Sequence, residues 1–141
     1  MNLESVGRRS VLVGGAAGVC ACALAACSSG GGSTSTSAAP STNADGSLTE
    51  LSAVPVGSSV AVGLPGGAQG IVTRTGETTA RAFSAICPHQ GCAVAPNDGK
   101  LVCPCHGSEF APDTGAVLEG PSKTGLSTVA VSVRDGKVYP A

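Results

Sequence analysis

The chain has 141 residues, a length that predicts one folded domain at most. Aromatic residues make up 2% and charged residues 12%, so a core must be built from valine, leucine, isoleucine and alanine. A small chain with so few large side chains usually needs a covalent or metal crosslink, and its seven cysteines are the candidates. The formal net charge of -1, without a run of either sign, offers no basic surface and excludes nucleic-acid binding.

The first 26 residues have the features of a bacterial export signal. Arg8 and Arg9 precede an uncharged apolar run over 11–26. The arginine pair resembles a twin-arginine signal, the export route of proteins that fold before they cross the membrane. An ordinary secretory signal with a chance arginine pair is the alternative. A membrane-spanning helix is disfavoured, because the run is shorter than about 18 residues and is diluted by glycines.

Cys27 directly follows this signal and would be the first residue of the mature chain. The sequence Leu-Ala-Ala-Cys at 24–27 resembles the lipobox of bacterial lipoproteins, in which cleavage before the cysteine leaves its thiol to carry a diacylglyceryl group. Two acyl chains are enough for stable anchoring. Cys20 and Cys22 fall in the discarded segment. Residues 27–46, rich in Ser and Gly, then form a lipid-anchored flexible linker, because they cannot bury enough apolar surface to fold. The expected location is extracytoplasmic, at the cell membrane.

The remainder, 47–141, is predicted to be all-β. Val129, Val131 and Val133 alternate with smaller or polar residues, a period of two that places them on one buried face. Asp-Gly at 135–136 turns this strand into a second one over 137–139, and Asn-Asp-Gly at 97–99 marks another hairpin. The other expected strands cover 59–62, 70–73, 81–85, 93–95, 100–102 and 116–118. No 11-residue window has a helical stripe.

Two short loops carry the residues with metal chemistry. The first reads Cys-Pro-His-Gln-Gly-Cys over 87–92, and the second Cys-Pro-Cys-His-Gly-Ser over 103–108. Each offers thiols and one imidazole within a few residues, and the turn at 97–99 would fold the loops toward each other. They supply four potential metal ligands with two cysteines left over, drawn from Cys87, His89, Cys92, Cys103, Cys105 and His106.

Several cofactors compete for these residues. Structural zinc is satisfied by two cysteines and two histidines, although the one-residue gap in Cys87-x-His89 is unusual for a zinc loop. A plant-type ferredoxin is disfavoured because Cys103-x-Cys105 breaks the required spacing and the histidines have no role. The haem attachment signature C-x-x-C-H is missed by one residue, and the C-x-x-C of a thiol oxidoreductase is absent.

The pairing of C-x-H with C-x-x-H resembles the Rieske 2Fe-2S family, in the branch that carries a disulfide. The resemblance is close over 82 to about 121. It implies a small antiparallel Rieske-type sandwich over 47–141, with two cluster-binding loops and one 2Fe-2S cluster. Carried over residue by residue, it implies that Cys87 and Cys103 bind one iron and that His89 and His106 bind the other. It also implies a disulfide between Cys92 and Cys105, which export makes chemically reasonable.

Three further features bear on the cluster in this resemblance. Ser108 resembles the family serine whose hydroxyl donates to a bridging sulfide, with a loop-capping hydroxyl as the alternative. Phe110 stands where many high-potential relatives have a tyrosine, which argues against the upper end of their range of potentials. Gly120-Pro121 resembles the proline loop that covers the cluster, or else is a plain turn.

The ligand set predicts the electron chemistry. With two thiolates and two neutral imidazoles the oxidised cluster is uncharged, whereas four thiolates would make it doubly negative. Adding an electron is therefore easier, and Rieske potentials lie at roughly -150 to +300 mV. Each imidazole also keeps a second ring nitrogen that can exchange a proton, which suits hydroquinone oxidation.

The expected function is one-electron transfer on the outer side of the cytoplasmic membrane. The chain would be a subunit of a quinol-oxidising complex with a cytochrome-type acceptor. The alternatives are a small electron-transfer subunit of another extracytoplasmic oxidoreductase, or a zinc-stabilised binding module without redox function. No independent substrate site or catalytic residue is evident, and a ring-hydroxylating oxygenase is excluded because ligands for a mononuclear iron are lacking.

Overall fold

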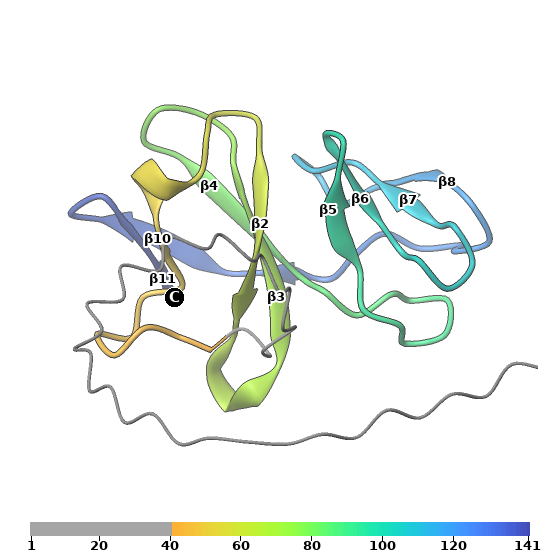
Figure 1. Cartoon of the computed structure of the whole chain (residues 1–141), viewed down its shortest axis with the longest axis horizontal. Coiled ribbons are helices and arrows are strands. Elements are labelled where there is room, and N and C mark those ends of the chain that lie inside the picture. Colours follow the sequence, from red (N-terminus) through yellow and green to blue (C-terminus); the bar gives the residue numbers. More distant parts are fainter. Residues whose placement is uncertain (1–40) are drawn as a thin grey trace, which may run out of the picture. The chain divides into compact units, whose positions relative to one another are not determined.

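The computed structural model describes residues 41–141, shown in Figure 1. The expected export and lipidation residues, Arg8, Arg9 and Cys27, lie outside the described residues, as does the boundary after residue 26. Within 41–141, no helix has the length and apolar character needed to cross a bilayer.

Three antiparallel sheets make up the fold. The first has the order β1-β11-β10, the second β2-β3-β4-β9 and the third β5-β6-β7-β8. The strands of the first sheet are β1 (Thr49–Glu50), β10 (Val131–Arg134) and β11 (Lys137–Pro140). Those of the second are β2 (Ser59–Gly63), β3 (Gln69–Arg74), β4 (Ala80–Ser84) and β9 (Thr128–Val129). Those of the third are β5 (Ala95–Asn97), β6 (Lys100–Val102), β7 (Glu109–Phe110) and β8 (Val117–Glu119). The described helices, Leu51–Ala53 and Pro65–Gly67, are single 3-10 turns, so the all-β expectation is confirmed.

The second sheet is buried on both faces and separates two hydrophobic cores. Consecutive residues of a strand point to opposite faces, so Val72 and Ala82 enter the first core, whereas Ile71 and Phe83 enter the second. The first core lies toward the first sheet and contains Leu48, Leu51, Val62, Val72, Ala82 and Val138. The second core lies toward the third sheet and contains Ile71, Phe83, Ala85, Cys87, Val94, Leu101, Cys103, Phe110 and Leu126. Both candidate iron-binding thiols therefore belong to the second core.

The valine-rich segment differs in part from the expectation of one strand. It divides at Ala130, where β9 leaves its pairing with β4 and β10 begins to pair with β11. The three alternating valines nevertheless pack against the same first core, half-buried rather than fully buried. The period of two was thus correct for the shared face, while the change of sheet was not visible in the sequence.

Both Asp-Gly hairpins are confirmed. Asp98 and Gly99 have φ of 45° and 75°, and Asp135 and Gly136 have φ of 49° and 73°. Two central residues with positive φ define the type I′ turn, whose twist matches that of the strands it joins. The first turn joins β5 to β6 and thereby holds together the sheet that carries one of the cysteine loops.

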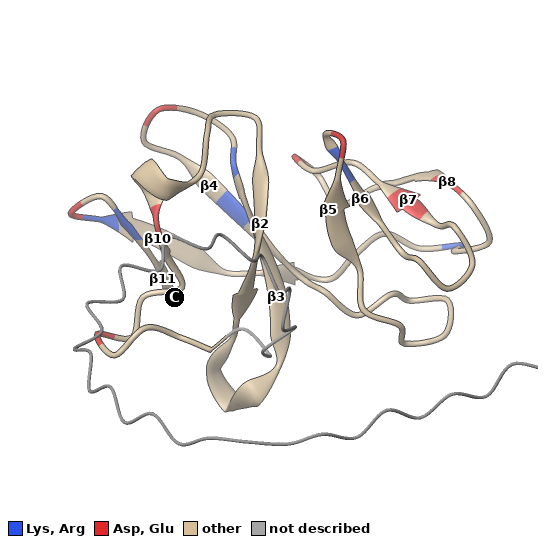
Figure 2. Ribbon diagram, viewed as in Figure 1, with Lys and Arg blue, Asp and Glu red and all other residues tan. Residues whose placement is uncertain are grey.

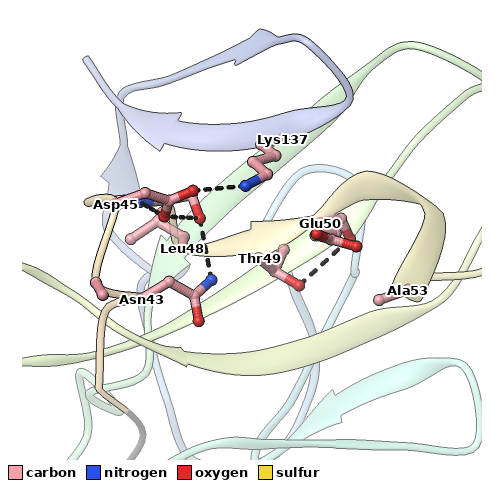
Figure 3. A pocket seen from close by; sticks show the side chains of 9 residues that line it. Asn43, Asp45, Leu48, Thr49, Glu50, Ala53 and Lys137 are labelled. Carbon is pink, nitrogen blue, oxygen red and sulfur yellow. Dashed lines mark hydrogen bonds and ion pairs between the residues drawn. The ribbon is translucent and has the colours of Figure 1, made fainter.

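An ion pair fastens the beginning of the described chain to the first sheet, as Figure 3 shows. Lys137 Nζ lies 2.6 Å from Asp45 Oδ2, and the backbone N–H of Ser47 donates to the other carboxylate oxygen at 3.0 Å. Hydrogen bonds from Lys137 and Ser47 hold the pKa of Asp45 well below its ordinary value. The adjoining shallow hollow, of about 460 Å³, is lined by residues 43–45 and 47–50 together with Ala53 and Lys137, so it shares no residue with the cysteine loops.

Candidate metal centre

The two cysteine loops are the ends of two hairpins. Ligand loop 1, residues 87–92, lies between Ile86 and Ala93, which pair in an isolated antiparallel bridge. Ligand loop 2, residues 103–108, connects β6 to β7, which pair through Val102 and Glu109. The strands before and after each loop therefore determine where the loops lie.

Ligand loop 1 is closed by two backbone hydrogen bonds. Cys87 N–H donates to the carbonyl of Cys92 at 2.8 Å, and Gly91 N–H donates back to the carbonyl of Cys87 at 2.8 Å. Gly91 has a φ of 76°, which glycine adopts without strain. The loop is thus a tight ring that fixes the direction of the Cys87 side chain.

Ligand loop 2 repeats this pattern. Cys103 N–H donates to the carbonyl of Ser108 at 2.8 Å, and Gly107 N–H donates to the carbonyl of Cys103 at 3.0 Å, with φ of 74° at the glycine. The equivalence pairs Cys87 with Cys103 and Cys92 with Ser108. The two loops are therefore two copies of one backbone motif, a relation that the sequence showed only as a local similarity.

The two equivalent cysteines are buried free thiols. Cys87 is 2% exposed and Cys103 is 1% exposed, and both pack in the second core. Within 41–141 they are the cysteines that take no part in a disulfide. A thiolate excluded from water is a good ligand for a soft metal centre and a poor group to leave unpaired.

The two histidines bring their rings together from separate loops. The ring centroids of His89 and His106 are 4.8 Å apart, and the planes meet edge to face at 85°. His89 is half-buried and His106 is exposed. The two free thiols therefore lie in the second core, whereas the two imidazole rings contact each other nearer the surface.

A disulfide joins the two loops. Cys92 and Cys105 are bonded, with their Cα atoms 6.4 Å apart, so the disulfide implied by the family resemblance is present. The sulfur of Cys103 lies within 4.8 Å of both disulfide sulfurs. These three cysteines do not make a metal site of their own, because two of them have given up their thiols to the bridge.

A third segment, residues 120–122, covers Ser108 and is called the covering segment below. Ser122 N–H donates to Ser108 Oγ at 3.1 Å. A Cβ added at Gly120 would lie 2.5 Å from Ser108 Cα, so the segment lies directly on ligand loop 2. The sequence predicts a proline loop or a plain turn at Gly120-Pro121. It gives no signal at Ser122, because the group that Ser122 contributes is a backbone N–H.

Phe110 is fully buried in the second core, together with both free cysteines. Its phenyl ring brings apolar surface and no hydroxyl to this core. The expectation that the centre lacks the tyrosine hydrogen bond of high-potential relatives stays a prediction.

The residues of this centre fit a 2Fe-2S cluster. Two buried thiols and two imidazoles form the mixed donor set that the cluster of this type requires. Ser108 is fully buried, and its oxygen accepts a hydrogen bond from Ser122, while no residue of 41–141 accepts its hydroxyl proton. A buried hydroxyl proton needs an acceptor, and a cluster sulfur would provide one.

The ligand loops themselves carry no charged side chain, whereas Glu109, Glu119 and Lys123 directly adjoin ligand loop 2 and the covering segment. The two ligand loops and the covering segment contain no Asp, Glu, Lys or Arg, and Figure 2 shows uncoloured ribbon over the loops that lead from β4 to β5 and from β6 to β7.

Comparisons with known proteins agree with this geometry. Residues 47–130 match the family model described as the Rieske [2Fe-2S] domain. The plasma membrane Rieske protein PetC3 from Synechocystis PCC 6803 is 33% identical, with a TM-score of 0.55 over 68% of this chain and 95% of that chain. A Sphingomonas yanoikuyae B1 ferredoxin is 26% identical, with a TM-score of 0.55 over 67% and 94%.

A larger enzyme contains the same fold. Naphthalene 1,2-dioxygenase is 26% identical, with a TM-score of 0.58 over 67% of this chain and 25% of that chain. No match was found among the curated proteins. With a family model matched over more than half of its length, and with the disulfide and both cysteine-histidine loops in place, the chain belongs to the Rieske family, whose domain binds a 2Fe-2S cluster and transfers electrons.

Proposed function

We propose that this chain is an exported, lipid-anchored Rieske protein that carries single electrons on the outer side of the cytoplasmic membrane. Its donor is a quinol-oxidising membrane protein and its acceptor a cytochrome. Cys87 and Cys103 hold one iron, and His89 and His106 hold the other. The observation that carries the proposal is the pair of equivalent loops, which supply two buried free thiols and two imidazole rings that contact each other. The likeness to a plasma membrane Rieske protein supports the membrane setting.

The positions of the ligands suit electron entry at the surface. When bound, the cluster supplies a one-electron couple. The buried cysteines keep their iron away from water, whereas exposed His106 and half-buried His89 bring the other to the surface. The imidazole nitrogen that does not bind iron can hydrogen-bond a hydroquinone and take its proton, so that proton and electron leave together.

The surroundings of the ligands suit an uncharged partner. Ile86, next to Cys87, is 47% exposed, and Leu118, two residues before the covering segment, is 54% exposed. Exposed apolar side chains beside charge-free loops favour contact with an apolar protein surface over electrostatic steering. This arrangement supports a quinol-oxidising site embedded in the membrane more than a strongly charged soluble donor.

Membranes from the source cell test this function. Membranes that lack the gene should lose quinol-dependent cytochrome reduction, and the full-length chain should restore it, whereas the His106→Ala chain should not. Because the loops carry no charge, the restored rate should change little between low and physiological salt. An undiminished rate in the gene-deleted membranes would refute the quinol-oxidising role.

A second candidate is a small electron-transfer subunit of another extracytoplasmic oxidoreductase. This candidate is favoured by the likeness to a ferredoxin that is 26% identical. The match extends over 94% of the ferredoxin chain, so a free electron carrier can have nearly the size of this domain. The two candidates separate in the membrane experiment. Only the first predicts that loss of the gene abolishes electron flow from quinol.

Export and lipidation rest on residues 1–46 and have their own test. Changing Arg8 and Arg9 to lysine should leave the precursor inside the cell, because twin-arginine export depends on the arginine pair. Cys27→Ser should release the mature chain from the membrane, because it removes the acylated thiol. Cell fractionation and labelling with a radioactive fatty acid measure both effects. Unchanged fractionation together with full acyl labelling of the variants would refute the assignment.

A further inference from the structure

The covering segment contacts ligand loop 2 through buried groups. Ser108 is fully buried and Ser122 is 4% exposed, and the N–H of Ser122 lies 3.1 Å from the hydroxyl oxygen of Ser108. Ser122 also uses its own hydroxyl, which donates to the carbonyl of Thr124 at 2.9 Å. The side chain of Ser122 thus closes its own turn and leaves the backbone N–H directed at Ser108.

Gly120 fixes how closely this segment approaches. Its φ of +98° is strained for any other residue, and a Cβ would lie 2.5 Å from Ser108 Cα and 2.8 Å from the carbonyl oxygen of Gly107. Neither neighbour is a flexible side-chain end, so the added atom would have to move backbone. The distance between Ser122 and Ser108 therefore depends on a glycine at position 120.

The hydrogen bond leaves the Ser108 hydroxyl with one direction for its proton. Its oxygen accepts from Ser122, and the described residues offer that proton no acceptor. A hydroxyl whose oxygen is held by a donor rotates less freely, and its O–H is polarised toward stronger donation. The backbone N–H of Cys103 donates to the carbonyl of Ser108 and closes ligand loop 2. The hydroxyl proton of Ser108 is therefore held in the same loop as Cys103, a proposed iron ligand.

We propose that Ser122 is a positioning residue for the cluster: its backbone N–H orients and polarises the Ser108 hydroxyl, so that the covering segment sets the reduction potential through Ser108. The inference rests on the proposed function, since it takes a cluster sulfur as the acceptor of that proton. Donation to sulfur is stronger in the reduced, more negative state, so a well-oriented hydroxyl raises the potential.

Voltammetry on the cluster-loaded protein at fixed pH tests the coupling. Ser122→Pro removes the N–H, and Gly120→Ala pushes the covering segment off Ser108. Each should lower the equilibrium constant for reduction about fivefold, which corresponds to about 40 mV. In a Ser108→Ala background the same changes should have almost no effect, because the hydroxyl through which they act is gone.

Two further variants separate positioning from simple damage to the loop. Ser122→Ala keeps the N–H and should retain most of the wild-type potential. Gly125→Ala creates a comparable clash, 2.6 Å from the carbonyl oxygen of Gly115, in the same connection but away from Ser108. It should cost stability without the Ser108-dependent fall in potential. Equal falls with and without the Ser108 hydroxyl, or no fall at all, would overturn the proposal.

A hydrogen-exchange measurement keeps the proposal testable if the proline and alanine variants do not hold a cluster. Ser108→Ala removes the acceptor, so the Ser122 amide should exchange faster with deuterium than in the wild type. An unchanged exchange rate would overturn the positioning role. If the wild-type protein instead held no 2Fe-2S cluster, the proposed function would fail, while the exchange arm would still report whether the Ser122–Ser108 bond exists.

Discussion

Chains carrying Cys87→Ser or Cys103→Ser should be isolated without a cluster, with loss of nearly all bound iron. Each cysteine is at most 2% exposed, so no water can take the place of the lost thiolate, and a neutral serine hydroxyl is a far weaker ligand. His89→Ala and His106→Ala should abolish the Rieske absorption and electron paramagnetic resonance spectra. Those spectra, together with iron analysis, are the measurement.

Gln90→Ala is the matched control for this series. Gln90 lies between the two proposed ligands of loop 1 and the glycine that closes it, and its side chain is exposed. The Gln90→Ala chain should keep its iron and its spectra. A Cys87→Ser chain with a full cluster, or a Gln90→Ala chain as empty as Cys87→Ser, would mean that the ligands have been misassigned.

Cys92→Ser or Cys105→Ser should lower the free energy of unfolding by about 3 kcal/mol while leaving the iron ligands in place. The disulfide spans 13 residues, and a bridge of this span removes that much loop entropy from the unfolded chain in the chain-entropy model. Since it also joins the two ligand loops, iron should be lost faster on storage or in air. Denaturant unfolding and the time course of the visible spectrum measure the two effects.

The double variant Cys92→Ser, Cys105→Ser provides the control, because both single changes remove the same bond. Its free energy of unfolding should match that of either single variant rather than fall twice as far. Under mild anaerobic preparation all three should still contain a Rieske cluster. If Cys92→Ser were then as empty as Cys87→Ser, Cys92 would have to be a ligand and the pairing would be different.

Much of the strand pattern could be predicted from the sequence, for identifiable reasons. Both Asp-Gly turns were found because positive φ at two successive positions has a strong residue preference. Strands β1 and β7 escaped prediction because two residues are too few to show a period. The sequence does not predict the change of sheet at Ala130, because that change depends on pairing with distant strands: β9 pairs with β4, and β10 pairs with β11.

The sequence pattern also does not predict that both faces of the second sheet are buried. Ile71 and Val72 are adjacent and equally apolar, and only the presence of a further sheet on each side explains why both are buried. A local pattern reports one strand at a time. Which layers cover it is decided by residues far along the chain.

The candidate centre was predicted where side-chain chemistry carries the signal. Thiols and imidazoles at short fixed spacings carry the resemblance to the Rieske family, and that resemblance implies the four proposed ligands and the disulfide partners. The contribution of Ser122 could not be read in this way, because every residue but proline has the N–H that it uses. The closeness of Gly120 to Ser108 likewise depends on a contact 12 residues along the chain, for which a glycine before a proline was the sole signal.

The central claim is that the two paired loops hold a 2Fe-2S cluster, and the content of iron and acid-labile sulfide tests it most directly. The protein, matured in cells with an active iron-sulfur assembly system and purified without oxygen, should contain two irons and two sulfides per chain and no stoichiometric zinc. One zinc per chain without sulfide would contradict the account, because two buried thiols and two imidazoles would then form a structural site with no electron to transfer.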